Sequence, residues 1–158
     1  MELQERFAIL LQTIGFSEQD IAIQWHELHK AYTKKNRHYH NLNHLGDMVA
    51  CFDAYRKELQ FPNEVLYAIF YHDFIYKSTR KDNELKSANH ALMILPKQTA
   101  INKQLVHDMI VATKDHASKD NADMSWLIDF DLRILAKDWE DYKIYCNQIR
   151  KEYSIYPD

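Results

Sequence analysis

The stretch VLYAIFYHD at residues 65–73 predicts a strongly apolar helix that ends in two polar residues. Residues 65–71 are all apolar or aromatic, and Pro62 just upstream suits the first turn of a helix. An imidazole and a carboxylate, His72 and Asp73, end this strongly apolar segment, and both are costly to bury unless each finds a partner. The pair is interpreted either as two ligands of one metal site or as a helix-end histidine beside a solvated aspartate.

The composition around this stretch favours an all-α domain. The chain has 158 residues but only 2 glycines and 3 prolines. All-β folds use glycine at tight turns, and nucleotide-binding α/β folds use glycine-rich phosphate loops. Both classes are therefore disfavoured, and we expect a mostly helical fold.

Apolar periodicity and capping residues mark eight helix-forming segments along the chain, from which a bundle of seven or so helices is predicted. No repeat or linker interrupts them, so we expect one compact bundle over residues 1–158. The helix-forming segments are approximately residues 3–14 (followed by Gly15 in a left-handed conformation), 17–32, 45–52, 62–71, 82–93, 99–110, 125–135 and 138–153.

Charge and cysteine content argue against some classes of function. A net charge of −3 argues against binding nucleic acid through bulk positive charge. Cys51 and Cys146 match no metal, redox or disulfide pattern and are expected to be reduced thiols. No signal peptide is apparent and no segment approaches the length of a membrane span, so a cytoplasmic location without membrane contact is expected.

The chain has nine histidines, and several lie near carboxylates. His40 and His44 are four residues apart and would share a helical face. Asp129 and Asp131 interrupt an otherwise apolar run, and Asp131 falls among leucines, which implies a partner for its charge.

The order His44, His72-Asp73, Asp131 resembles the H…HD…D signature of the HD superfamily of metal-dependent phosphohydrolases, in a small bacterial branch of stand-alone proteins. The resemblance covers about residues 37–153. It is carried by the words RHYHNLNH (37–44), YHDFIY (71–76), DNELKSA (82–88), TKDH (113–116), DFDL (129–132) and IRKEY (149–153).

The resemblance implies an HD-type helical bundle with one divalent ion held by His44, His72, Asp73 and Asp131. His44 is preferred over His40 because the family's ligand histidine opens a helix at this place. Asp131 is preferred over Asp129 because the matching acid directly precedes a leucine. Each choice could shift to its neighbour. Iron, manganese, zinc, cobalt or nickel would suit this donor set, and magnesium less well.

The resemblance also implies hydrolysis of a small phosphorylated compound, with a nucleotide as one option. Asp73 could accept a proton from the attacking water. Auxiliary roles are expected for His40 and His116 as general acids or phosphate contacts, for Arg37 and Lys114 as phosphate-neutralising cations, and for Glu84 as a hydrogen-bond partner of a ligating histidine. Each of these auxiliary residues could instead be a solvated loop charge or a helix cap.

Two alternatives are of different classes: a metal- or nucleotide-binding regulatory module with little turnover, and an all-α interaction module with incidental histidines. Aromatic residues at helical spacing, Trp139, Tyr142, Tyr145 and Tyr153, fit a core or a homodimer interface.

Overall fold

The fold is all-α, as the composition predicted. The computed structural model describes residues 2–118 and 120–156, and these contain eight α-helices, two 3-10 helices and no strand. The elements are α1 (Leu3–Thr13), α2 (Glu18–Tyr32), α3 (Leu42–Tyr55), η1 (Arg56–Glu58), α4 (Pro62–Tyr71), α5 (Asn83–Met93), α6 (Lys103–Ala112), α7 (Ala122–Asp131), η2 (Leu132–Ala136) and α8 (Trp139–Glu152).

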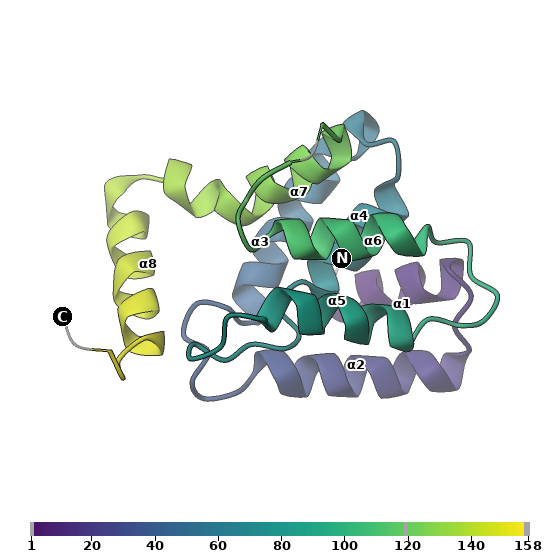
Figure 1. Ribbon diagram of the computed structural model, residues 1–158, viewed down its shortest axis with the longest axis horizontal. Helices are drawn as coiled ribbons and strands as arrows, with labels where there is room; N and C mark the ends of the chain where they lie inside the picture. Colours follow the sequence, from purple (N-terminus) through teal and green to yellow (C-terminus); the bar gives the residue numbers. More distant parts are fainter. Residues whose placement is uncertain (1, 119, 157–158) are drawn as a thin grey trace.

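Helix α4 is the centre of the bundle (Figure 1). Every residue from Glu64 to Tyr71 is buried, and α4 packs against α1, α3, α5, α6 and α7. A helix that is apolar all round is stable only when it is surrounded by other elements, which explains this position. The central helix therefore carries His72 and Asp73 at its carboxyl end into the interior.

Side-chain caps set the start of most of the other helices. Ser17 and Asp138 cap α2 and α8 at the starts that the sequence predicted, and Asn41 accepts from the backbone N–H groups of Asn43 and His44 at the start of α3. At Gly15, φ is +105° and an added Cβ would lie 2.9 Å from the carbonyl oxygen of Gln98, so the predicted left-handed residue is confirmed.

Two predicted helices have other bounds in the structure. Helix α6 begins after Asn102, whose side chain caps it. Thr99, the predicted start, does not cap the helix because its hydroxyl donates to the carbonyl of Ile14 at 2.8 Å. The predicted helix over 125–135 begins earlier, after Asn121, and stops as an α-helix at Asp131.

Beyond Asp131 the chain tightens into the 3-10 turn η2. Contacts to α3 hold this turn in place: Arg133 lies 3.3 Å from the Cys51 sulfur, and Lys137 pairs with Asp47 at 3.3 Å. The break leaves Asp131 at the end of α7.

Helix α8 lies at the edge of the molecule (Figure 1, yellow), beside the loops that precede α3 and α5. Its one buried residue is Glu152, whereas Trp139 is 66% exposed and Ile144 is 56% exposed. The predicted homodimer interface stays a prediction. Within the described residues, no helix is both long and apolar enough to cross a membrane.

Candidate metal centre

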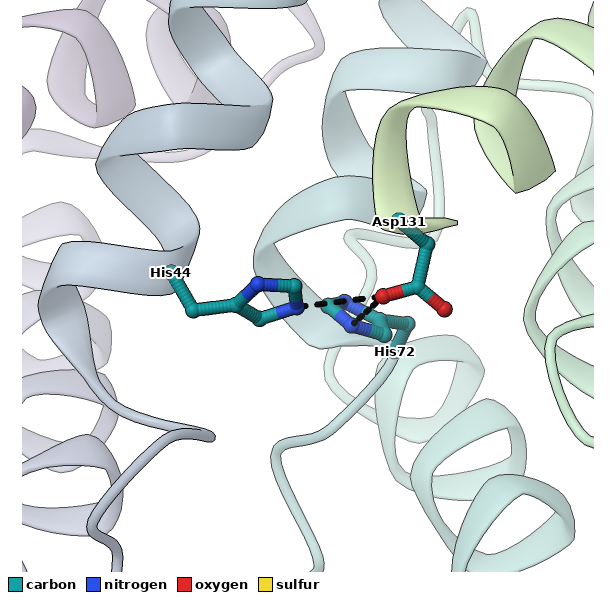
Figure 2. A group of neighbouring side chains, drawn as sticks. All are labelled: His44, His72 and Asp131. Atoms are coloured by element: carbon teal, nitrogen blue, oxygen red, sulfur yellow. Dashed lines mark ion pairs between the residues drawn. The ribbon is translucent and has the colours of Figure 1, made fainter. Parts of the chain in front are cut away.

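Three helices bring His44, His72 and Asp131 together (Figure 2). His44 lies in the first turn of α3, His72 directly follows α4, and Asp131 is the last residue of α7. One ligand atom from each lies within 4.8 Å of the others. The Nε2 atoms of His44 and His72 are 3.1 Å and 3.7 Å from Oδ1 of Asp131.

Asp73 adjoins this cluster. Its Oδ2 lies 3.0 Å from Nε2 of His72. The four residues that the resemblance implied as ligands therefore lie at one place, where the ends of α4 and α7 meet the start of α3. We refer to His44, His72, Asp73 and Asp131 as the metal cluster.

The donor atoms fit a cation. The Nδ1 atom of His72 donates to the carbonyl of Ile69 at 2.8 Å, which leaves Nε2 as the ring atom that faces the cluster. A ligating histidine commonly donates its second N–H to a backbone carbonyl in this way. The Nε2 atoms of His44 and His72 are buried and make no hydrogen bond of acceptable geometry. Buried lone pairs that face carboxylate oxygens need a cation between them or a proton.

The pKa shifts within the cluster agree with a requirement for a cation or a proton between these buried groups. Burial alone would lower the pKa of His72, but the carboxylates of Asp73 and Asp131 raise it to about 9. Burial alone would raise the pKa of Asp131, yet the hydrogen bond from His116 and the nearby rings of His44 and His72 hold it well below its usual range. The pKa of Asp73 is also lowered, because the histidines outweigh its burial. Two ionised carboxylates thus face two imidazoles, and a divalent ion would neutralise them.

His116 completes the outer side of the cluster. Its Nε2 lies 3.2 Å from Oδ2 of Asp131, and its side chain is 36% exposed. Its φ of +50° is in the left-handed region, which is sparsely populated by residues other than glycine. The backbone is therefore held in an uncommon conformation where the ring meets Asp131.

His40 binds to Glu152 rather than to the cluster. Its Nδ1 lies 2.6 Å from Oε2 of Glu152, and its ring centroid is 5.9 Å from that of His44. Burial alone would lower the pKa of His40, but Asp73 and Glu152 raise it. Hydrogen bonds likewise outweigh burial at Glu152 and lower its pKa to about 2.

Sequence reasoning assigned no role to Glu152, although the residue lies in the word IRKEY, one of those that carried the resemblance. Nor did it single out Tyr76, whose hydroxyl donates to Oε2 of Glu152 at 2.7 Å. No local pattern indicated either contact.

The guanidinium of Arg37 is buried and engaged by the backbone. It donates to the carbonyls of Asp73 at 2.7 Å, Phe74 at 2.9 Å and His40 at 3.2 Å. It also lies over the Tyr32 ring at 4.7 Å. Arg37 thus ties the loop before α3 to the end of α4.

The other expected residues lie outside the cluster. Lys114 is exposed in the loop after α6, and Asp129 is exposed on α7. Glu84 is half-buried in the first turn of α5, and within the described residues it forms no hydrogen bond or ion pair with a histidine.

A cavity of about 280 Å³ adjoins the cluster and is lined in part by His44 and Asp131. Tyr39 and Ile134 line it as well, together with the cations of Arg133 and Lys137. Sequence reasoning did not single out these two cations. Asp47, which pairs with Lys137 at 3.3 Å, lines the cavity as well, so the cavity beside the cluster presents both cations and carboxylates.

Comparison of the chain with protein-family models, curated proteins and solved structures found no match.

Proposed function

We propose that this protein is a metal-dependent phosphohydrolase of the HD type that acts on a small phosphorylated compound such as a nucleotide, and that it works in the cytoplasm. The proposal rests on the sequence resemblance together with one observation. The described structure gathers His44, His72 and Asp131, with Asp73 alongside, and leaves two buried Nε2 atoms without a hydrogen bond.

The ligand set determines which ions we expect. Two imidazole nitrogens with two carboxylates suit iron, manganese, zinc, cobalt or nickel, and suit magnesium less well. When bound, such an ion supplies a Lewis acid for a phosphoryl oxygen and for an attacking water.

The residues around the cluster have complementary tasks in this proposal. Asp73 accepts a proton from the attacking water, because one of its oxygens faces the cluster. His116 and His40 hydrogen-bond phosphate oxygens or the leaving group. Arg133 and Lys137, which line the adjoining cavity, attract the anionic substrate.

The deciding experiment compares two aspartates on the same helix. Asp131→Asn removes a cluster carboxylate, and Asp129→Asn is the matched control two residues away on the exposed side. We would measure metal content by elemental analysis, and phosphate release from a panel of nucleotides and sugar phosphates. The parent and Asp129→Asn should hold stoichiometric metal and release phosphate, whereas Asp131→Asn should lose both.

Other results would change the proposal in distinct ways. Metal without turnover on any substrate would favour a regulatory module that senses a ligand. Loss of metal in Asp129→Asn instead of Asp131→Asn would move the ligand to the neighbouring acid. No metal in the parent under any loading condition would contradict the site.

A further inference from the structure

Glu152 is the one buried residue of helix α8, whose other residues are half-buried or exposed. Its carboxylate has a side-chain exposure of 0% and would be costly to bury without donors. Four donors surround it. Oε1 accepts from the backbone N–H groups of Tyr39 at 2.7 Å and His40 at 3.0 Å, and Oε2 faces the Tyr76 hydroxyl at 2.7 Å and His40 Nδ1 at 2.6 Å.

These contacts define which nitrogen of His40 carries hydrogen toward Glu152. Backbone N–H groups can only donate, so Oε1 is an acceptor, and an ionised carboxylate with this many donors has no proton to give. Nδ1 of His40 must therefore be the donor to Oε2. Nε2 remains as the ring nitrogen that makes no hydrogen bond within residues 2–118 and 120–156.

The ring is held from further sides. It stacks on the Tyr76 ring at 4.5 Å, and its centroid is 5.9 Å from that of His44 in the metal cluster. The carbonyl of His40 accepts from Arg37, which also binds the carbonyls of Asp73 and Phe74. His40 is thus a side chain of fixed orientation beside the cluster.

We infer that Glu152 is a positioning residue: it holds His40 so that Nε2 is available to accept a hydrogen bond from the P–OH of a phosphate group bound at the metal cluster. The inference rests on the proposed function for the identity of that ligand. The sequence led us to expect a glutamate partner for a ligating histidine at Glu84. The structure provides a different glutamate, from the far end of the chain, for a different histidine.

The test uses Glu152→Gln, with Glu140→Gln as the matched control. Glu140 lies on the same helix and its side chain is 78% exposed, so this substitution leaves the site untouched. Nitrogen-15 NMR of the histidine rings reports which nitrogen of His40 is protonated. On the same samples, we would measure metal content and titrate inorganic phosphate.

In the parent and in Glu140→Gln, His40 should carry hydrogen on Nδ1, and phosphate should shift the Nε2 resonance. In Glu152→Gln the Nδ1 signature should be lost and phosphate should bind at least about tenfold more weakly, with metal content and helicity unchanged. His40→Gln should weaken phosphate binding similarly, and adding it to Glu152→Gln should weaken binding no further.

Three results would overturn the inference: hydrogen on Nε2 alone in the parent, an unchanged His40 signature in Glu152→Gln, or loss of metal together with phosphate binding in that variant. If Glu152→Gln does not fold, Glu152→Asp takes its place under the same criteria. Its side chain keeps the charge, but it is one methylene shorter, which moves the carboxylate away from His40. A parent without metal would contradict the proposed function, and the protonated nitrogen of His40 would then decide the positioning role by itself.

Discussion

Helices α4 and α8 both supply acidic groups around the same site, but they are held in opposite ways. Helix α4 is buried along residues 64–71 and delivers Asp73 to the cluster through apolar packing. Helix α8 buries only Glu152, and the hydrogen bonds of that carboxylate join its last turn to the loop before α3. The cluster is thus built by the core, whereas the last turn of α8 is attached beside it by polar contacts that depend on charge.

The largest expected effect is on α4. Phe70→Ala removes a side chain with 0% exposure and should lower the free energy of unfolding by about 3–5 kcal/mol, because it leaves a cavity in the core. Ile144→Ala, on the exposed face of α8, should change it by no more than about 0.5 kcal/mol. Urea unfolding of the two variants measures this difference, and equal effects would contradict the contrast between the helices.

Bound metal should raise the free energy of unfolding by a smaller amount than Phe70→Ala lowers it. A ligand that binds only the folded protein adds about 2.7 kcal/mol at a free concentration of 100 times its Kd. Zinc or cobalt at that excess should therefore raise the parent's unfolding free energy by this amount. His72→Ala should lose the increase. His26→Ala, which alters an exposed histidine of α2, should keep it. A thermal or urea titration that shows the same increase in both variants would place the ion elsewhere.

Acid should weaken the attachment of α8, because it protonates the Glu152 carboxylate. The carboxyl pKa falls from its ordinary 4.5 to about 2 in the folded protein, so its ionised form stabilises the fold. That contribution is fully present above about pH 4.5 and is lost as the pH falls toward 2. The stability difference between the parent and Glu152→Gln should therefore shrink over this range. Unfolding at a series of pH values, followed by circular dichroism, measures it, and a difference that does not vary with pH would contradict the role of the charge.

The smallest expected effect is at Tyr76. Tyr76→Phe removes one hydrogen bond to a charged acceptor but keeps the ring that stacks on His40. It should lower the free energy of unfolding by about 1.5 kcal/mol. This is the lower limit of the range of about 1.5–3 kcal/mol for a hydrogen bond to a charged group, because water can replace the hydroxyl. Urea unfolding of this variant, compared with Tyr55→Phe on the exposed end of α3, would test it. A cost equal to that of Phe70→Ala would show that α8 is held as firmly as the core.

The sequence predicted the features that depend on neighbouring residues. Apolar periodicity located the central helix, and the dipeptide His72-Asp73 at its end pointed to a site because two polar groups there needed partners. The family resemblance, rather than the neighbouring residues alone, led us to prefer Asp131 over Asp129, and the structure brings Asp131 to the cluster while Asp129 is exposed.

Contacts between distant segments could not be predicted in this way. Glu152 meets Tyr39 and His40 across more than a hundred residues, and no periodicity or capping pattern encodes such a pair. The end of α7 at Asp131 depends on contacts of Arg133 and Lys137 with α3, which become visible only once the two helices are placed together.

The position of Glu152 along the chain also has a consequence for synthesis. The metal cluster draws on residues 44 to 131, but the group that fixes His40 belongs to the last turn of α8. While the chain is still emerging from the ribosome, the helical core can assemble and His40 has no carboxylate to bind. A product truncated before Glu152 would keep the cluster residues and the Arg37 contacts of the loop at 37–41 but would leave His40 without its carboxylate, so the proposed role of His40 would depend on translation having run through α8.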